Sequence, residues 1–383
     1  MHDNGRSRRR FLAAGASLGA AAFAGCTVPG MGGDDSGSAS VPSLTSFRGS
    51  GPLVEGRPAP GGTSIEDLPD LSGDLALYLG GGEGGIYRSF VDALQEIYPE
   101  FNVEVLPGDS ASLAQTVVEE VDAGNQRADV FWSIDAGSLA IVANNDAYAA
   151  LPSDVTGPVP DSFVGADNAW VGVAGRARAV PYNTDELSES DIPNKVADFP
   201  DTAALGDIGW APTYGAFKSF ITAMRQLRGE DATRSWLNAM QETSITRYPN
   251  EYEVSSAVAN GSLASGFANH YYAMRVRSSN PEAPIGLAFT EGDAGALVNA
   301  AGALAIQGTE KRELVNLFIR HLLSAEAQEF FATVAYSYPM IPEVEPVGNL
   351  PTIDELSPPD FDLAALADVQ ATNDLLRDTG VLQ

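Results

Sequence analysis

Two residue types that build metal and redox sites are scarce in this chain of 383 residues. Cysteine occurs once, as Cys26, so an intramolecular disulfide and a cluster of thiolate ligands are both excluded. Histidine occurs three times, as His2, His270 and His321, which excludes a site built from several imidazoles. A metal site in this chain must therefore use oxygen ligands from Asp, Glu or Tyr, and such ligands suit hard cations.

Basic residues are also few, with 22 Lys and Arg against 51 Asp and Glu and a formal net charge of −29. This charge excludes nucleic acid and an anionic membrane surface as partners, because both would be repelled. The acidic residues are spread along the chain and indicate a solvated surface. We interpret them as an adaptation to high salt, where screening over a few ångströms removes the self-repulsion.

The N-terminal residues 1–26 have the features of an export signal. The run SRRRFL at 7–12 has the twin-arginine form, and the apolar run that follows is too short to span a bilayer permanently. The signal ends in FAGC at 23–26, which resembles a lipobox that would make Cys26 a lipid-modified N-terminus. The alternative is an ordinary signal peptide with an incidental cysteine. Residues 27–70 are rich in Gly, Ser, Pro and Asp and predict a disordered tether.

The body begins near Asp74 and alternates predicted strands with predicted helices. This alternation is typical of a mostly parallel α/β sheet, whose ligands bind beyond the carboxyl ends of the strands. The rule places the glycine-rich turn at 80–85 and the segment at 133–137 beside a binding cleft. The turn lacks the lysine of a phosphate-binding loop and contains Glu83, so nucleotide binding is excluded. A second α/β unit follows at about 208–268.

Two adjacent tyrosines, Tyr271 and Tyr272, follow His270 at a predicted strand-to-helix turn. Neighbours on a helix point about 100° apart and neighbours on a strand point to opposite faces, so two phenols serve one site best where the geometry changes. The alternative is that both rings simply fill an inter-domain crevice.

A second polar segment, at 176–184, is predicted to be extended, which puts Arg176, Arg178 and Tyr182 on one face. Two guanidinium groups beside a phenol would line an anion pocket. The alternative is that they form salt bridges with the acidic surface.

Several segments, taken together, match one known family. They read ADVFWSIDAG at 128–137, GRARAVPYNT at 175–184, NHYY at 269–272, GALVN at 295–299 and LLSAEAQ at 322–328. The chain thereby resembles the ferric-iron substrate-binding proteins of ABC importers over about residues 74–340.

The resemblance implies an α/β fold of the type II periplasmic-binding-protein kind, a two-lobed clamshell with hinge strands between the lobes. One lobe would comprise 74–178 plus 285–383, and the other 183–280. The family also implies a monomeric protein, not an enzyme, on the extracytoplasmic face of the membrane. It would deliver ferric iron to an ABC permease and its ATPase subunits.

The resemblance also implies the site residues. Tyrosine phenolates hold iron in this family, which points to Tyr271 and Tyr272 and adds Tyr182 and Tyr214. Some members supply a histidine or carboxylate from the first lobe. No histidine occurs in its loops here, so Glu83 is the candidate carboxylate and Asp135 a weaker one. The remaining residues implied are Arg176 and Arg178, which would hold a small anion such as carbonate, and His270, which would lie beside the ligands.

Tyrosine suits ferric iron because iron displaces the proton of a phenol, and the phenolate is a hard oxygen donor. Two alternatives remain open at this point. The same fold binds organic cations such as thiamine or a polyamine through cation–π contacts, or an oxyanion. A secreted enzyme is the other alternative, although the sequence contains no recognisable catalytic constellation.

Overall fold

The computed structural model describes residues 47–81 and 85–382, through which a mixed sheet of twelve strands runs. The predicted signal at 1–26, with Cys26, and the candidate ligand Glu83 lie outside the described residues, as does the first part of the predicted tether. Within the described residues, no helix has both the length and the apolar character that crossing a membrane requires.

Three parallel strands form the first part of the sheet, in the order β2 (Phe101–Gly108), β1 (Gly73–Gly80) and β3 (Val130–Ser133). The apolar run that predicted a strand at 75–79 forms the buried part of β1. Antiparallel β11 (Val298–Ile306) pairs with β3, and the short β4 (Tyr148–Ala149) pairs with β11. The helices of this part are α2 (Ile86–Ile97), α3 (Ser110–Asp122), α4 (Ala136–Asn144), α10 (Arg312–Leu322) and α11 (Ala325–Thr333). We call these elements the first region.

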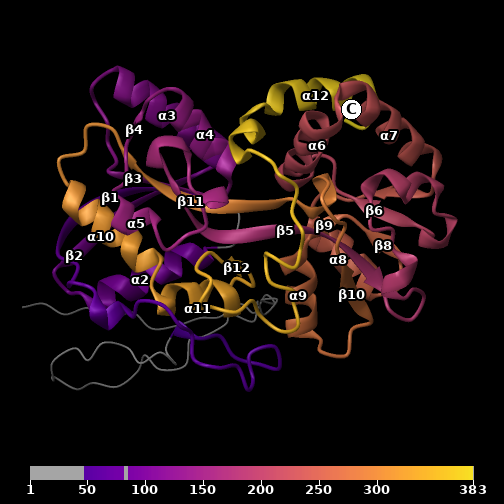
Figure 1. Ribbon diagram of the computed structural model, residues 1–383, viewed down its shortest axis with the longest axis horizontal. Coiled ribbons are helices and arrows are strands. Elements are labelled where there is room, and N and C mark those ends of the chain that lie inside the picture. Colours follow the sequence, from indigo (N-terminus) through magenta and orange to yellow (C-terminus); the bar gives the residue numbers. More distant parts are fainter. Residues whose placement is uncertain (1–46, 82–84, 383) are drawn as a thin grey trace, which may run out of the picture. The chain divides into compact units, whose positions relative to one another are not determined.

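The longest strand, β5 (Val171–Asn183), is buried along its whole length and connects the two parts of the sheet. Its first half pairs with β11 and with the short β12 (Tyr338–Pro339). Its last residues, Val180 to Asn183, pair with antiparallel β10 (Ile285–Ala288). Figure 1 shows β5 beside β11, continuing toward β9 (Ala268–Asn269), with which it also pairs.

The second region contains the parallel strands β6 (Ile208–Trp210), β7 (Ile245–Arg247) and β8 (Ser265–Gly266), together with β9 and β10. Aromatic rings fill its core: Phe267 lies 5.0 Å from Phe199, 5.7 Å from Phe220 and 5.9 Å from Trp236, measured between ring centroids. Its helices are α6 (Gly215–Arg228), α7 (Glu230–Glu242), α8 (Glu251–Ala259) and α9 (His270–Ser279).

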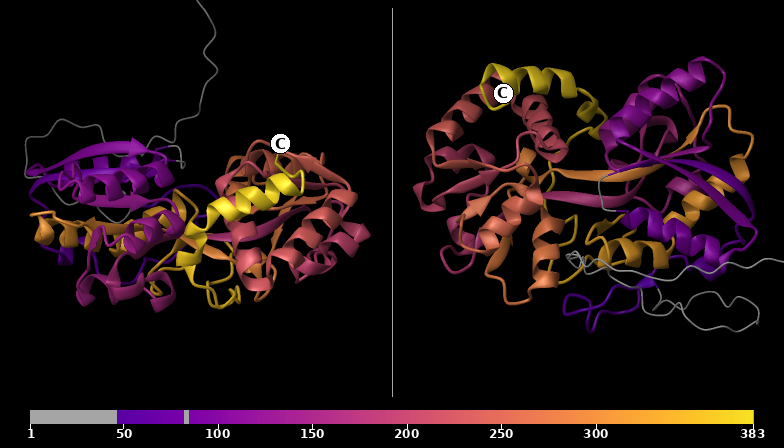
Figure 2. Two further views of the ribbon diagram at one scale, coloured as in Figure 1. Left: turned by 90° about the horizontal axis from the view of Figure 1, so that it is seen from above. Right: turned by 180° about the vertical axis from the view of Figure 1, so that it is seen from behind.

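The C-terminal helix α12 (Val369–Asp378) lies beside α6, and Figure 2 shows it in yellow along the helices of the second region. The hydroxyls of Thr222 and Thr372 are 2.7 Å apart, and Arg225 donates to the carboxylate of Asp368 at 3.1 Å. By these contacts, α12 belongs to the second region. The lobe boundaries proposed from the sequence stay a prediction. The remaining short segments are η1 (Ile65–Asp67), α5 (Ser153–Thr156), η2 (Asp161–Phe163), η3 (Ala166–Asn168), η4 (Glu189–Asp191), η5 (Val196–Asp201), η6 (Ala203–Leu205), η7 (Ala294–Ala296) and η8 (Leu363–Ala367).

Residues 47–70, predicted as the last part of a disordered tether, are instead packed against the first region. Phe47 and Ile65 are 3% and 1% exposed, and the ring of Phe47 lies 5.6 Å from that of Phe90. The composition of 27–70 suggested too little apolar surface to order the segment. The few apolar residues that it has after residue 46 are buried, which corrects the prediction for 47–70.

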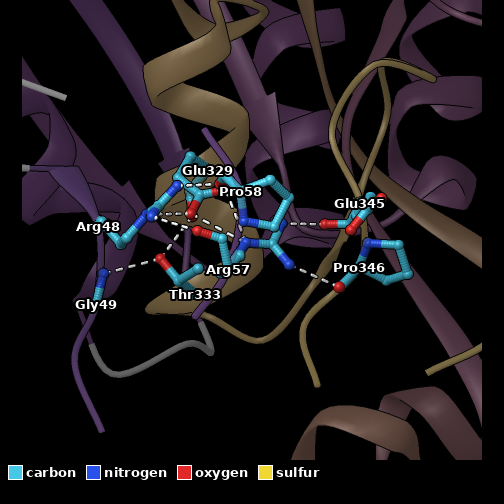
Figure 3. Close-up of polar contacts among 8 residues, drawn as sticks. All are labelled: Arg48, Gly49, Arg57, Pro58, Glu329, Thr333, Glu345 and Pro346. Atoms are coloured by element: carbon cyan, nitrogen blue, oxygen red, sulfur yellow. Dashed lines mark hydrogen bonds and ion pairs between the residues drawn. The ribbon is translucent and has the colours of Figure 1, made fainter. Parts of the chain in front are cut away.

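Two arginines hold this segment through one buried carboxylate (Figure 3). Glu329 of α11 is fully buried, and its oxygens lie 2.7 Å from Nε of Arg48 and 3.0 Å from Nε of Arg57. Arg57 also donates to the carbonyl oxygens of Glu345 and Pro346. Charge pairing with α11, which composition alone does not reveal, therefore fixes the segment before β1.

Candidate metal centre

Three helices of the second region begin with tyrosine. Tyr214 is the residue directly before α6, Tyr252 is the second residue of α8, and Tyr271 and Tyr272 are the second and third residues of α9. Helices α6 and α9 each follow a strand of the same sheet, as the sequence predicted for Tyr271 and Tyr272. Their positive N-terminal ends favour negative charge, including that of a phenolate.

The side chain of Tyr272 contacts the other three tyrosines. Its hydroxyl is hydrogen-bonded to the hydroxyl of Tyr214, and the two rings are 6.2 Å apart. The rings of Tyr271 and Tyr252 lie 4.3 Å and 6.4 Å from that of Tyr272. Tyr271 and Tyr272 are 1% and 4% exposed, whereas Tyr252 is 45% exposed. The cluster therefore has a buried end and a solvent-facing end.

A guanidinium group accompanies the tyrosine pair. Arg275 lies one helical turn after it, with Cζ 5.1 Å from the ring centre of Tyr271 and 5.5 Å from that of Tyr272. Its spacing of three and four residues from the two tyrosines places it on their side of the helix. The sequence interpretation missed Arg275, although this spacing was a signal that could have found it. A cation here offsets negative charge on the phenols.

A buried ion pair fixes the start of α9. Arg178 of β5 and Glu251 of α8 are 3% and 0% exposed, and Nη1 lies 2.5 Å from Oε1. The other oxygen of Glu251 accepts from the backbone N–H of Asn269 at 2.8 Å, and Arg178 donates to the side-chain oxygen of Asn269 at 3.3 Å. The sequence left two interpretations of Arg178, an anion pocket or a salt bridge with the acidic surface. The structure shows a salt bridge, and its carboxylate is buried rather than on the surface. Glu251 was not predicted, because only the fold brings it to β5.

The chain's relatives can now be stated. Residues 89–375 match the family described as bacterial extracellular solute-binding protein. The chain belongs to this family. The major ferric iron-binding protein of Neisseria meningitidis serogroup B is 29% identical over 259 residues, covering 66% of this chain and 78% of that protein. The Fe(3+)-binding periplasmic protein of Serratia marcescens is 26% identical over 301 residues, covering 78% of this chain and 88% of that protein.

Solved structures agree on the fold of this solute-binding protein. Iron-bound HitA from Pseudomonas aeruginosa is 26% identical with a TM-score of 0.71, covering 80% of this chain and 99% of that one. FutA of Trichodesmium, in complex with iron and citrate, is 21% identical with a TM-score of 0.68 over 80% and 99%. The prediction of a two-lobed α/β fold of the periplasmic-binding-protein type is confirmed.

Tyr182 lies further along β5 than the residue that pairs with the start of α9, and its role as a ligand stays a prediction. Tyr182 pairs with Ser265 and Gly286, whereas Asn269, just before α9, pairs with Arg178. The four residue steps from Arg178 to Tyr182 span about 13 Å of strand. Burial raises the pKa of Tyr182, with a contribution from the charge of Glu189, and this disfavours a phenolate.

The ring of His270 lies 5.6 Å from that of Tyr271, and both of its nitrogens contact the backbone of this solute-binding protein. Its Nδ1 accepts from the N–H of Ala177 at 3.2 Å, and its Nε2 lies 2.7 Å from the carbonyl oxygen of Tyr336. Burial lowers the pKa of His270 to about 4, and the charges of Arg176 and Arg275 act in the same direction. A neutral imidazole with both nitrogens engaged fits a supporting role. Arg176 is 7% exposed on β5, opposite Asn299, and close enough to His270 to affect it.

Asp135 is occupied by its own helix. One carboxylate oxygen accepts from the N–H of Ser138 at 2.8 Å and the other from its hydroxyl at 2.9 Å, which caps α4. Both oxygens of Asp135 are engaged in this cap, and its role as a ligand stays a prediction. Across 47–81 and 85–382, no group of three or more His, Cys, Asp or Glu residues is arranged to hold a metal ion. The tyrosine cluster is therefore the site that the described residues offer to a hard cation.

Proposed function

We propose that this protein binds ferric iron as its transported ligand through Tyr214, Tyr271 and Tyr272. The observation that carries the proposal is the contact between the hydroxyls of Tyr214 and Tyr272, which lie 58 residues apart and on different helices. Two phenol oxygens that meet in this way can bind one cation together. The names of the relatives from Neisseria meningitidis and Serratia marcescens, both ferric iron-binding, support the same ligand.

The chemistry of the cluster favours ferric iron over softer ions. A free phenol has a pKa of about 10 and stays protonated at neutral pH. A trivalent cation breaks the O–H bond, forms an iron–oxygen bond and releases the proton to solvent, as metals generally do with their ligands. The resulting phenolate is a hard donor. Arg275 offsets the charge of the phenolates of Tyr271 and Tyr272.

Three tyrosines leave coordination positions for other oxygen donors. A small anion such as carbonate would fill part of them, attracted by Arg275 and by the helix N-termini. Glu83 remains the candidate carboxylate from the first region on the ground of sequence alone.

The arginine also argues against an organic cation such as thiamine or a polyamine. A cation–π site needs an accessible ring face with no cation on it. Here the guanidinium of Arg275 already lies against the rings of both Tyr271 and Tyr272. A second organic cation at these rings would be repelled.

The cellular role that we propose follows from the signal segment and the family. The protein is exported by its twin-arginine signal, anchored by a lipid at Cys26 and held outside the membrane. It acts as a monomer, performs no catalysis, and passes iron to an ABC permease with its ATPase subunits. Its acidic surface suits a high-salt environment.

The test is to add ferric iron to the purified protein and record the visible charge-transfer band of phenolate bound to iron. We expect a band in the parent protein and its loss or weakening in Tyr271→Phe, Tyr272→Phe and Tyr214→Phe. Losing even a partner of a ligand costs about 10–100-fold in metal affinity, and losing a ligand costs more. Tyr182→Phe is the matched control, since it removes a buried phenol of the same sheet outside the cluster.

Two outcomes contradict the proposal. A folded parent protein without a band would remove the iron hypothesis. A band that persists unchanged in all three variants of the cluster, or that disappears in Tyr182→Phe, would show that the ligands lie elsewhere.

A further inference from the structure

We infer that Tyr252 is a further ligand of the transported iron, the solvent-facing phenol that the ion meets first. This inference rests on the proposed function and adds a residue that neither the sequence interpretation nor the relatives' names assign. With Tyr182 outside the cluster, Tyr252 restores the number of phenols there to four.

The first observation is the position of the Tyr252 ring. Its centre lies 6.4 Å from that of Tyr272, at an interplanar angle of 61°, and Tyr272 in turn shares its hydroxyl contact with Tyr214. Tyr252 is 45% exposed, and among the described residues it is one of two large apolar side chains with high exposure. An exposed phenol ring at the edge of a buried phenol cluster is accessible both to an ion in solvent and to the cluster.

The second observation is that the backbones under Tyr252 and Tyr272 are joined by one carboxylate. Glu251, the residue before Tyr252, accepts from the N–H of Asn269, three residues before Tyr272, at 2.8 Å. Its pairing with Arg178 at 2.5 Å is buried. Asn250 caps α8 through the N–H of Glu253 at 2.9 Å. The starts of α8 and α9 are therefore held together. The backbones of Tyr252 and Tyr272 stay neighbours when the side chain of Tyr252 changes rotamer.

The third observation is the contrast in mobility that burial produces. Tyr271 and Tyr272 are nearly fully buried, so their rings are confined by packing. Tyr252 is exposed, and exposed side chains change rotamer on the picosecond-to-nanosecond scale. Tyr252 can thus turn its oxygen outward to an arriving ion and inward to the hydroxyls of Tyr214 and Tyr272. On binding, its O–H bond breaks, an iron–oxygen bond forms, and the proton leaves directly to solvent.

Tyr252→Phe separates a ligand from a packing residue, because it keeps the ring and removes only the hydroxyl. Tyr248→Phe is the matched control. Tyr248 lies four residues before Tyr252, in the connection between β7 and α8. It is half-buried and packs in a small apolar cluster with Val254 and Ala257. Three quantities are measured on the full-length protein: the charge-transfer band per bound iron, the protons released per iron, and the rate of iron loss to excess citrate.

We expect Tyr252→Phe to release one proton fewer per iron than the parent and to show a weaker, shifted band. We also expect its iron loss to citrate to be at least about tenfold faster, in the range seen when metal sites lose a supporting group. Tyr248→Phe should match the parent in all three. A role in packing would leave the proton count unchanged, so that count decides between the two roles.

The outcomes distinguish this inference from the proposed function. If the folded parent gives no band, the proposed function fails and this inference falls with it. If Tyr272→Phe abolishes the band while Tyr252→Phe keeps the band, the proton count and the release rate of the parent, the function stands and the inference about Tyr252 is overturned.

Discussion

Helices begin differently in the two regions of the sheet. In the first region α3 and α4 are capped by aspartates: Asp109 accepts from the N–H of Ser112 at 3.0 Å, and Asp135 from that of Ser138 at 2.8 Å. In the second region the residues before α6 and α9 are Tyr214 and Asn269, and within the described chain neither side chain makes a capping hydrogen bond. The oxygen of Asn269 accepts from Arg178 instead.

This difference separates stability from binding. A side-chain cap stabilises a helix by about 1 kcal/mol, and α3 and α4 of the first region have this contribution. The second region forgoes it at two helices and places phenols at their positive ends, where a negative ligand is favoured. Departures from the ordinary rules of helix formation are expected where a protein binds its ligand. The uncapped starts of α6 and α9 thus coincide with the tyrosine cluster, whereas α8, which carries Tyr252, is capped by Asn250.

The largest expected effect on the free energy of unfolding comes from removing the carboxylate of Glu251, which holds the start of α9 where a side-chain cap is missing. Glu251→Ala leaves the guanidinium of Arg178 buried without its counter-ion, and breaking a buried pair costs about 3–5 kcal/mol. We expect a loss of that size in the free energy of unfolding, measured by chemical denaturation.

Glu230→Ala is the control for this loss. Glu230 is also the first residue of a helix and pairs with Arg234 at 3.0 Å, but the pair is exposed and should contribute less than about 1 kcal/mol. Equal effects of the two substitutions would mean that Glu251 does not hold the start of α9 as described.

Buried histidines sharpen the comparison through pH, since each region contains one. In the first region, His321 lies 2.8 Å from the carbonyl oxygen of Leu317 and 3.2 Å from the hydroxyl of Tyr98. Burial lowers the pKa of His321 to about 4, and the charge of Arg320 acts in the same direction.

The pH effect has a definite sign. Between pH 6.5 and 4 the unfolded chain binds the proton of His321 and the folded chain does not, so stability falls as the pH falls. One proton corresponds to about 1.4 kcal/mol per pH unit. We expect His321→Gln to reduce the slope of unfolding free energy against pH by about this amount within that window, and to leave it unchanged above pH 7. A variant with the slope of the parent would show that His321 titrates normally in the folded protein.

Sequence reasoning found the parts of this protein that depend on local pattern. The apolar run at 75–79 and the strand-to-helix turn before Tyr271 are local, and both were predicted. The partners of Tyr272 were found only partly. Tyr214 was predicted because it directly precedes a helix. Tyr252 and Glu251 contact these residues only because α8 packs on β5, and the neighbouring sequence does not predict that packing.

Other positions could not be predicted for physical reasons of the same kind. The period of the strand predicts which residues share a face with Tyr182, but it carries no information on how far Tyr182 lies along β5 from the other tyrosines. Residues 47–70 have the composition of a tether, yet Arg48 and Arg57 find the buried Glu329 nearly three hundred positions later. Composition is blind to such pairings.

The smallest expected effect on stability comes from a crossed pair of substitutions that tests the comparison directly. Asp135→Ala removes a cap and should cost about 1 kcal/mol of unfolding free energy while leaving the iron band and its affinity unchanged. Tyr214→Phe removes no cap, but it does remove the hydroxyl that is hydrogen-bonded to the hydroxyl of Tyr272, so the unfolding free energy should fall by about 0.5–1.5 kcal/mol. Its effect should appear in the charge-transfer band.

Both quantities must be measured on both variants, by denaturation without iron and by titration with it. If Tyr214→Phe destabilised the protein as much as Asp135→Ala and left the band intact, the tyrosine would be a structural N-terminal residue like the aspartate. The two regions would then differ only in the residue type that begins their helices. If Tyr214→Phe weakens the band and Asp135→Ala does not, the uncapped start of α6 serves the ligand and the capped start of α4 serves the fold.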